Sequence, residues 1–390
     1  MHGYTDADLD PDDREIVSAA ADFADRKLAP YALEWDAAAH FPVDELRQAA
    51  QLGMGAIYCD TEHDGSGLRR LDGVRIFEQL AYADPAVAAF LSIHNMCAWM
   101  VDAYGTQSQR AQWIPRLSSM ESVASYCLTE PGAGSDAAAL TTRARRDGDE
   151  YVLDGVKQFI SGGGVSDLYV VMARTGEPGP KGISTFLVEA GTPGLGFGPS
   201  EHKMGWHAQP TAQVIFEGVR VPASSLLGEQ EGRGFGIAMN GLNGGRLNIA
   251  ACSLGGAQAA YDKAADYVAD RKAFGQALID EPTIRFTLAE MATDLAAARL
   301  MLARAATALD AGEPDKVERC AMAKLHVTQT CHRIADQALQ LHGGYGYLHE
   351  YGVEKIVRDL RVHRILEGTN EIMKVVIGRA IADRHRTTDR

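Results

Sequence analysis

Residues 284–309 read IRFTLAEMATDLAAARLMLARAATAL, and this stretch decides how the second half of the chain folds. Its apolar residues recur at alternating steps of four and three: Ile284, Leu288, Met291, Leu295, Ala298, Leu302, Ala305 and Leu309. This spacing puts them on one face of a helix, and such a seam suits packing against near-antiparallel helices. A free coiled coil is the alternative, but alanine-rich segments on both sides favour an intramolecular bundle.

Helical patterns flank the seam on both sides. The segment 235–269 carries apolar residues at the same spacing, and Pro314 begins a further predicted helix that runs to Leu341. The glycine-rich stretch 343–346 ends that helix, and a short helix over 353–359 follows. We therefore expect residues 233–390 to form a C-terminal helical bundle.

The character of the sequence changes at about Ser122. Short apolar runs, separated by loops with Pro and Gly, predict strands at 122–128, 168–173, 183–188 and 213–216. Asp147-Gly148 and Asp154-Gly155 predict hairpin turns. We therefore expect residues 122–232 to form a middle antiparallel β domain.

One turn in this middle part is rich in small residues. Residues 129–136 read TEPGAGSD, which lacks the GxGxxG spacing, and no helical pattern follows directly. The turn is therefore not predicted to be a Rossmann turn. Its small residues do allow a flat or phosphorylated ligand to approach the backbone closely.

The first 121 residues predict a helical domain. Helices are expected at 13–35, 42–50, 71–83, 85–104 and 110–117. Residues 86–91 are nearly all apolar, which indicates a helix buried on most sides. The whole chain is thus expected to be a multi-domain α and β protein in the order α, β, α.

The composition excludes several classes of protein. The 390 residues include 38 Lys and Arg against 52 Asp and Glu, with no basic run, so no nucleic-acid-binding face is expected. No apolar run approaches the length of a membrane span. The acidic, polar residues 1–13 do not resemble a signal or transit peptide. We expect a soluble, cytoplasmic protein.

The cysteines and histidines predict neither disulfides nor a metal site. No CxxC pair occurs among the six cysteines, which predicts reduced core thiols: Cys59, Cys97, Cys127, Cys252, Cys320 and Cys331. His342 and His349 lie seven residues apart with a glycine-rich turn between them, which is not a zinc-like spacing.

The stretch Arg364–Met373, RILEGTNEIM, places one carboxylate between an apolar pair and a Gly-Thr-Asn turn. The following residues, 371–381, have helical spacing, and Thr369 or Asn370 can cap the start of that helix. Glu367 is thus expected in a short loop between two helices. Apolar surroundings raise the pKa of a carboxylate, which suits a general base. A solvent-exposed glutamate beside a helix cap is the alternative.

Four motifs give the sequence a resemblance to the acyl-CoA dehydrogenase family over nearly the whole chain. In the family's order they are YCLTEPGAGSD at 126–136, RKAFG at 271–275, QLHGG at 340–344 and LEGTN at 366–370. Within the family, GLNGGRLNIA at 241–250 and HGGYGYL at 342–348 most resemble the members that oxidise isobutyryl-CoA.

The resemblance implies a fold, a cofactor and partners. Family members consist of an N-terminal helical domain, a β-barrel-like middle domain and a C-terminal four-helix bundle, which agrees with the order expected above. They bind FAD, share it between the subunits of a homo-oligomer that is usually a tetramer, and pass electrons to an electron-transferring flavoprotein. They act on acyl-CoA thioesters.

The resemblance also implies which residues bind the cofactor. Residues 126–135 would line the flavin, 159–161 would cover its other side, and Arg271, Phe274 and 340–344 would reach the FAD of a neighbouring subunit. The expected cofactor-binding residues are Tyr126, Cys127, Leu128, Thr129, Gly134, Ser135, Phe159, Ile160, Ser161, Arg271, Phe274, Gln340, Leu341, His342, Gly343, Gly344, Thr369 and Glu371.

The chemistry implied by the resemblance is a 2,3-dehydrogenation. Glu367 would remove a C2 proton from the thioester, its backbone N–H and a ribityl hydroxyl of FAD would donate to the thioester oxygen, and hydride would leave C3 for the flavin. The residues expected at the substrate are Ser135, Asn243, Arg246, Leu366 and Gly368.

Two departures from other family members predict the substrate. Isovaleryl-type members take their base from the helix near residue 245, where this chain has Gly245, so Glu367 is the only base in place. Straight-chain members often carry Tyr before the base, where this chain has Leu366, which leaves lateral room for a 2-methyl branch. Isobutyryl-CoA, an intermediate of valine breakdown, is the expected substrate.

Other functions remain as alternatives. A short straight-chain or 2-methylbutyryl-CoA dehydrogenase would need the same residues. An acyl-CoA oxidase shares the half-reaction but is longer, with an extra C-terminal domain, and a non-catalytic flavin-binding scaffold would not need Glu367.

Overall fold

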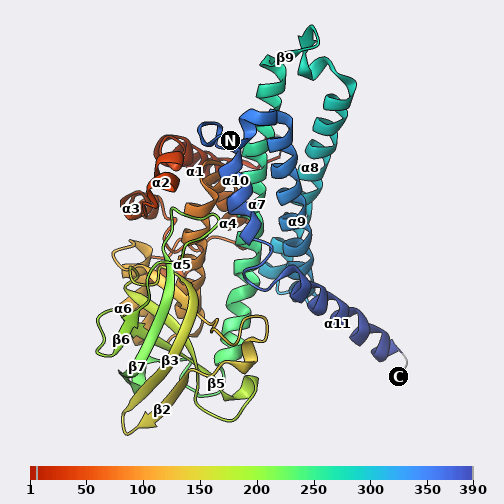
Figure 1. The fold of residues 1–390 in the computed structure, drawn as a ribbon. Helices are drawn as coiled ribbons and strands as arrows, with labels where there is room; N and C mark the ends of the chain where they lie inside the picture. The colour runs from red at the N-terminus through yellow and green to blue at the C-terminus, as the bar shows by residue number, and fades with distance from the viewer. Residues whose placement is uncertain (6–7, 389–390) are drawn as a thin grey trace.

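The structure is a computed structural model that describes residues 1–5 and 8–388, and it has a helical part, a β part and a second helical part in that order (Figure 1). The predicted fold class is therefore confirmed. The exact boundaries after residues 121 and 232 stay a prediction.

The N-terminal part differs from the prediction in its first helix. Residues 13–35 do not form one helix: the helical turns that begin with α1 end at Leu28, and α2 begins at Ala32. The break coincides with Pro30, which has no N–H to donate to a helix. The helices of this part are α1 (Pro11–Phe23), a π-helical turn (Ala24–Leu28), α2 (Ala32–Ala38), α3 (Val43–Ala50), α4 (Arg70–Ala83), α5 (Pro85–Tyr104) and α6 (Gln107–Ser118).

Helix α5 is long and apolar enough to cross a membrane by length and composition alone, so the expectation that no run reaches that length is wrong. In the folded chain 78% of its most apolar window is buried. The helix packs against α4, α6, α7 and β1, which is the environment of a core helix.

The middle part is one twisted sheet. Its strands are β1 (Ala124–Cys127), β2 (Arg143–Asp147), β3 (Glu150–Ser161), β4 (Leu168–Arg174), β5 (Ile183–Glu189), β6 (Leu195–Phe197), β7 (Thr211–Pro222) and β8 (Leu226–Leu227). The order is β6-β7-β3-β2-β4-β5-β8, with β1 on β4. Most pairs are antiparallel as expected, but β4 runs parallel to both β1 and β2.

One of the two predicted hairpin turns is wrong. Asp147-Gly148 does form the turn between β2 and β3, but Asp154-Gly155 lies inside β3, at a register shift against β7. A Cβ on Gly155 would lie 2.5 Å from the Thr142 Oγ1 atom, and the residue has a φ of +149°. Glycine at this position therefore permits a bulge and a close approach of two chains, not a turn.

In the C-terminal part, the structure confirms the apolar seam predicted over residues 284–309. Its central residues, from Leu288 to Ala305, are buried on α8, where they face α9 and α7. The elements are α7 (Gly234–Asp270), the short strands β9 (Lys272–Ala273) and β10 (Gln276–Ala277), α8 (Pro282–Asp310), α9 (Lys316–His342), α10 (Val353–Val362) and α11 (Asn370–Thr388).

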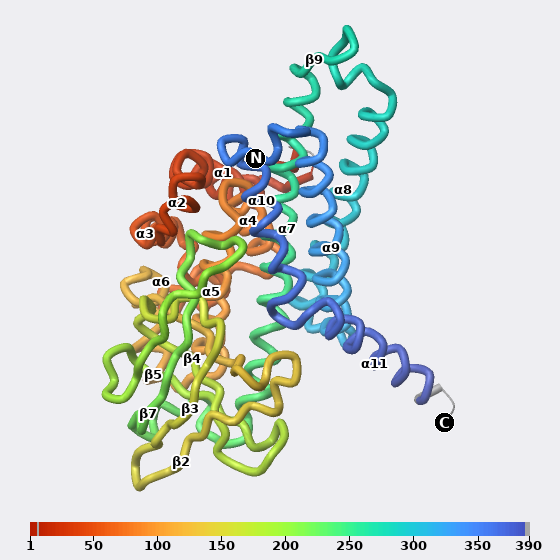
Figure 2. The backbone as a smooth tube through the Cα atoms, in the orientation of Figure 1, coloured from red at the N-terminus to blue at the C-terminus, as the bar shows by residue number. Residues whose placement is uncertain are grey.

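Helix α7 is the long helix that connects the β part to the far end of the helical bundle. It begins beside the β sheet, runs through the helical bundle and ends at the β9–β10 tip (Figure 2). Helix α11 starts at the opposite end of the bundle from that tip and projects away from the rest of the chain (Figure 1). All six cysteines are free and buried, as predicted.

Candidate active site

The loop between α10 and α11 is held by its backbone. Glu367 and Gly368 both have positive φ angles, +55° and +88°, a conformation that a residue with a side chain adopts only where its surroundings impose it. Two buried cations contact the two carbonyl groups. Arg246 Nε donates to the Glu367 carbonyl oxygen at 3.2 Å, and Lys324 Nζ donates to the Gly368 carbonyl oxygen at 2.8 Å.

The Glu367 carboxylate itself is buried and unpaired. Among the residues that the structure describes, no hydrogen-bond donor contacts either of its oxygens. A Cβ atom on Gly245 would lie 2.6 Å from the Oε2 atom, so the carboxylate lies directly against α7. Burial raises the pKa of Glu367 to about 7, although the charges of Lys324 and Arg246 act in the opposite direction. The carboxylate is thus buried, as the raised pKa expected from the sequence requires, but two cations rather than apolar groups alone lie near it.

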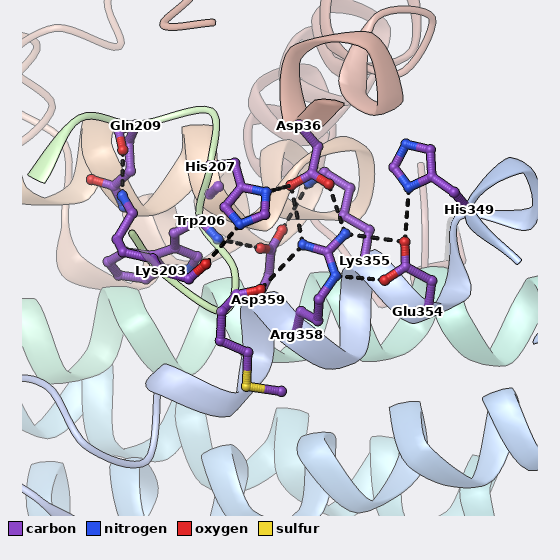
Figure 3. Close-up of polar contacts among 12 residues, drawn as sticks. Asp36, Lys203, Trp206, His207, Gln209, His349, Glu354, Lys355, Arg358 and Asp359 are labelled. Carbon is purple, nitrogen blue, oxygen red and sulfur yellow. Dashed lines mark hydrogen bonds and ion pairs between the residues drawn. The ribbon is translucent and has the colours of Figure 1, made fainter. Parts of the chain in front are cut away.

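Helix α10 leads into this loop and is fixed by ionic contacts to two other parts of the chain (Figure 3). Lys355 Nζ contacts Asp84 at 3.1 Å and Asp359 at 2.8 Å, and all three side chains are buried. The backbone N–H of Trp206, from the middle part, donates to Asp359. These contacts place α10 against the N-terminal helices and against the loop between β6 and β7.

A second set of contacts continues from α10 toward Glu367. The Trp206 indole N–H donates to His363 Nε2 at 3.2 Å, and the other ring nitrogen of His363 lies 2.7 Å from Ser253 Oγ on α7. Burial lowers the pKa of His363 to about 3, so the ring is neutral. His363 therefore fixes the start of the loop without adding a charge near the base.

The structure brings two of the predicted cofactor-binding stretches together. The backbone N–H of Gln158 donates to the Thr129 carbonyl oxygen at 2.8 Å, and Ser125 Oγ donates to the Ser161 carbonyl oxygen at 2.6 Å. The stretches 126–135 and 159–161 thus lie side by side although they are distant in sequence.

This pair of stretches lies close to the base. Burial is the main cause that raises the pKa of Tyr126, and the charge of Glu367 adds to it. Tyr126 donates its hydroxyl hydrogen to the carbonyl of Ala238 on α7. Cys127 on β1 and Ile160 on β3 are buried in one core cluster, and Leu128, just after β1, is buried in another, whereas Gly134 and Ser135 are exposed.

Phe159 is the most informative residue of this pair. Its backbone has a φ of +58°, and the residue is 64% exposed although the next residue on β3, Ile160, is buried. A large apolar ring held outward by an uncommon backbone angle is suited to covering a flat aromatic ligand.

The remaining predicted cofactor residues lie at the far end of α7. Arg271, Gln340, Leu341, His342, Gly343 and Gly344 line one open pocket of about 390 Å³. From Arg246 to Asp270, where α7 ends, the helix rises about 36 Å at 1.5 Å per residue. The pocket and Glu367 therefore lie at opposite ends of the bundle.

Two predicted residues are occupied by internal contacts. His342 is buried, its ring stacks on Tyr267 at a centroid distance of 4.5 Å, and its Nδ1 atom bonds to the Ala338 carbonyl. Asn243 is buried and accepts a hydrogen bond from Arg246 at 2.9 Å. His342 thus forms a wall of the pocket, and Asn243 orients the cation that holds the base loop.

The other predicted residues of the loop lie as expected from sequence. Leu366 is half-buried and packs against the main core. Thr369 caps α11, because its Oγ1 atom accepts a hydrogen bond from the Ile372 N–H at 3.2 Å. Glu371 is exposed on the first turn of that helix.

Sequence reasoning missed Lys324, Trp206 and His363. Lys324 interrupts the apolar face of α9 and is fully buried, and a lysine on the core face of a predicted helix could have been noticed. No local signal marked Trp206 or His363, because their contacts join residues more than 100 positions apart.

The fold and the site together indicate a class of enzyme. In the described chain, a framework of helices and strands places the buried, unpaired carboxylate of Glu367 near the exposed stretches around Ser135 and Phe159, which suit a flat cofactor. Three domain families match the chain. They are the acyl-CoA dehydrogenase N-terminal domain over residues 10–121, the middle domain over 125–219 and the C-terminal domain over 232–382. The chain belongs to the acyl-CoA dehydrogenase family.

Individual relatives agree with this assignment. The chain is 54% identical to the isobutyryl-CoA dehydrogenase of Dictyostelium discoideum, over 96% of this chain and 90% of that protein. It is 53% identical to the Bos taurus enzyme of the same name, over 96% and 89%. Its structure matches the butyryl-CoA dehydrogenase of Megasphaera elsdenii with a TM-score of 0.93 and 36% identity, over 96% of this chain and 99% of that one.

Acyl-CoA dehydrogenases depend on FAD, and FAD is the cofactor of this chain. The residues present fit that group. Added Cβ atoms at Gly132, Gly134, Gly343 and Gly344 would meet nothing within 4 Å, so both the turn in the middle part and the pocket at the end of α7 are open to a ligand. The exposed ring of Phe159 would suit contact with a flavin, and Arg271, which lines the pocket, would offer a positive charge to a pyrophosphate.

Proposed function

We propose that this chain catalyses the 2,3-dehydrogenation of short branched acyl-CoA thioesters, with isobutyryl-CoA preferred and Glu367 as the base. The observation that carries the proposal is the buried Glu367 carboxylate. It has no hydrogen-bond partner among residues 1–5 and 8–388, while its loop is held by backbone contacts. A carboxylate with a pKa of about 7 is matched to accepting a proton near neutral pH.

The reaction breaks two C–H bonds of the acyl group. Glu367 takes the proton from C2, the electron pair of that bond becomes the C2–C3 π bond, and hydride leaves C3. Bound FAD supplies the acceptor for this hydride. The Glu367 backbone N–H donates to the thioester oxygen, where negative charge develops. The residues proposed at the thioester are Ser135, Arg246, Leu366 and Gly368, with Asn243 acting through Arg246.

Thr129 and the surrounding stretch 126–135 are proposed to bind the flavin together with 159–161 and, in the same subunit, Thr369 and Glu371. The pocket formed by Arg271 and 340–344, with Phe274 beside it, is proposed to bind the cofactor of a neighbouring subunit, because it lies at the opposite end of the bundle from Glu367. A homotetramer follows the usual state of the family.

The preference for a 2-methyl branch rests on Leu366 and Gly245. Leu366 is smaller than tyrosine and half-buried beside the base, and Gly245 has no side chain where the carboxylate meets α7. Both leave room beside C2. An isobutyryl-CoA dehydrogenase of this kind would serve valine breakdown.

The electron acceptor and the location are also proposals. An electron-transferring flavoprotein is the acceptor proposed from the family. The expectation of a cytoplasmic location stays a prediction, and the two relatives compared above are mitochondrial by name.

Anaerobic mixing of the yellow holoenzyme with isobutyryl-CoA tests the activity, because hydride transfer bleaches the flavin. Values of kcat/KM for isobutyryl-, butyryl-, isovaleryl- and octanoyl-CoA with an artificial acceptor test the preference. Isobutyryl-CoA should lead by a modest margin, since one methyl group in an apolar pocket is worth about 1–3 kcal/mol. A clear lead for octanoyl- or isovaleryl-CoA would reject the preference but not the activity.

Two further results would point to the alternatives. Rapid reoxidation of the reduced enzyme by oxygen would indicate an oxidase. No bleaching by any acyl-CoA would indicate a flavin-binding scaffold. Leu366→Tyr sharpens the substrate test, because the larger ring should lower the isobutyryl-to-butyryl ratio of kcat/KM by about tenfold.

A further inference from the structure

We propose that Lys324 is a positioning residue for the base: its buried ammonium group holds the loop by the backbone at Gly368 and so keeps both oxygens of Glu367 free for the substrate's proton. The inference rests on the proposed function of Glu367. It adds a residue on α9, 43 positions before the base, whose role concerns the shape and the charge of the loop.

The contacts of Lys324 place it at the centre of the turn that carries the base. Its Nζ atom donates to the Gly368 carbonyl oxygen at 2.8 Å and to Asn370 Oδ1 at 3.0 Å. The first acceptor precedes Thr369 and the second follows it. Lys324 therefore fixes the turn on both sides of the residue that caps α11.

The arrangement differs from that of an ordinary buried ion pair. A buried ammonium and a buried carboxylate usually bond to each other, because each alone is costly to bury. Here Lys324 and Arg246 both donate to loop carbonyls and to the amides Asn370 and Asn243, whereas the carboxylate has no partner in the described part of the chain.

A base benefits from this division of contacts. A carboxylate bonded directly to a cation is held in its ionised form and is a weak proton acceptor. A loop without anchors would leave Glu367 free to turn toward one of the cations. By holding the backbone, Lys324 supplies the anchor and leaves the carboxylate lone pairs unused.

The same ammonium group also acts through its charge. Lys324 and Arg246 both lower the pKa of Glu367, Lys324 with the larger influence, against the larger effect of burial. Electrostatics connects further ionisable groups of the described chain with Lys324, Arg246 or Glu367. They are Tyr126 on β1, Cys252 on α7, Cys320 on α9, His363 at the end of α10, and Arg364 and Glu371 at the ends of the loop. Removing the Lys324 charge should therefore raise the pKa of Glu367.

Three variants separate the two roles. Lys324→Met has a similar length but neither donor nor charge, and Lys324→Gln keeps a donor without the charge. Thr328→Val is the control, because Thr328 also contacts Asn370, one turn further along α9, but does not contact the Gly368 carbonyl.

The rate of anaerobic flavin bleaching by isobutyryl-CoA, measured from pH 5.5 to 9, is the first readout. Lys324→Met should slow it about a hundredfold, the size expected when a catalytic group is misplaced by about 1 Å, with acyl-CoA affinity changed less than threefold. The acidic limb of the pH profile should move up by about one unit. Lys324→Gln should recover much of the rate but keep the shifted limb, and Thr328→Val should change neither.

The second readout needs no substrate. The difference in thermal stability between each protein and its Glu367→Gln derivative, followed over pH, reports the pKa of Glu367 in the folded chain. Lys324→Met should move this curve up by about one pH unit. Wild-type rate and an unmoved curve in Lys324→Met would overturn the proposal, as would equal slowing by Thr328→Val. Failure of wild type to bleach would instead reject the proposed function, and the stability curve would still judge Lys324.

Discussion

The two ends of the helical bundle differ in how completely one chain builds them. At the Glu367 end, the carboxylate is buried and its loop is anchored by cations on α7 and α9. His363, just before the loop, is tied to Trp206 of the middle part and to Ser253 on α7. At the Arg271 end, a pocket is open to solvent and the Phe274 ring beside it is 96% exposed, with a φ of +52°.

This difference indicates which functions need a second subunit. An aromatic ring that is almost fully exposed on a backbone of uncommon angle gains nothing within its own chain. If Glu367 is the base, as proposed, one chain supplies the proton acceptor and its anchors, whereas the Arg271 end is proposed to need a partner subunit that brings its cofactor.

Loss of the base is the largest effect expected at the Glu367 end. Glu367→Gln keeps the shape of the side chain but cannot accept a proton, so turnover should fall about a hundredfold to ten-thousandfold. Flavin content and acyl-CoA affinity, measured by absorbance and by titration, should stay near wild type. Near-normal turnover in this variant would remove Glu367 from the mechanism.

The same variant should become more stable than wild type as the pH rises. Burial raises the pKa of Glu367 from 4.5 to about 7, so the folded chain favours the protonated form. Protonated Glu367 therefore adds about 3 kcal/mol to the free energy of unfolding. This contribution is fully present below pH 4.5 and is lost as the pH rises through 7. Thermal unfolding from pH 4.5 to 8.5 should show Glu367→Gln level with wild type at the low end and above it at the high end. Parallel curves would contradict a buried, ionisable base.

At the Arg271 end, substitutions are expected to affect the retention of FAD and the assembly of subunits. Arg271→Ala removes a charge-assisted bond of about 1.5–3 kcal/mol, so FAD affinity should fall about tenfold to a hundredfold and the oligomer should loosen. Lys272→Ala, an exposed charge on the next residue, is the matched control and should change little. Flavin titration measures the FAD affinity, and size-exclusion chromatography measures the size of the oligomer. Identical behaviour of the two variants would indicate that Arg271 is an ordinary surface charge.

The smallest effect concerns the fit of the base against α7. Gly245→Ala adds a Cβ atom 2.6 Å from the Oε2 atom of Glu367. The flexible carboxylate can avoid this contact by a small side-chain rotation, which costs about 0.5–1.5 kcal/mol. Turnover should fall by up to about tenfold with little change in melting temperature. Gly236→Ala, on the same helix with nothing within 4 Å of the new Cβ, is the control. A loss of stability without a loss of turnover would mean that the glycine serves packing alone.

Local sequence patterns were enough for much of the fold. The apolar steps from 284 to 309 predicted α8 and its buried face, Pro85 marked the start of α5, and the turn after Asp147 was visible in its Asp-Gly pair. The same patterns placed Glu367 between two helices. Each of these features depends on residues a few positions apart, which is the range over which periodicity and turn preferences act.

The tertiary structure alone decided what surrounds those elements. Asp154-Gly155 has the residues of a turn, but Gly155 lies at a bulge within β3, where Thr142, just before β2, approaches it closely. Lys324 reaches Gly368, and Trp206 reaches His363, only because α9, α10 and the loop between β6 and β7 pack together. The sequence by itself determined that a carboxylate follows α10. Whether that carboxylate is paired, and with what pKa, depends on donors and burial supplied by distant segments, which no local pattern records.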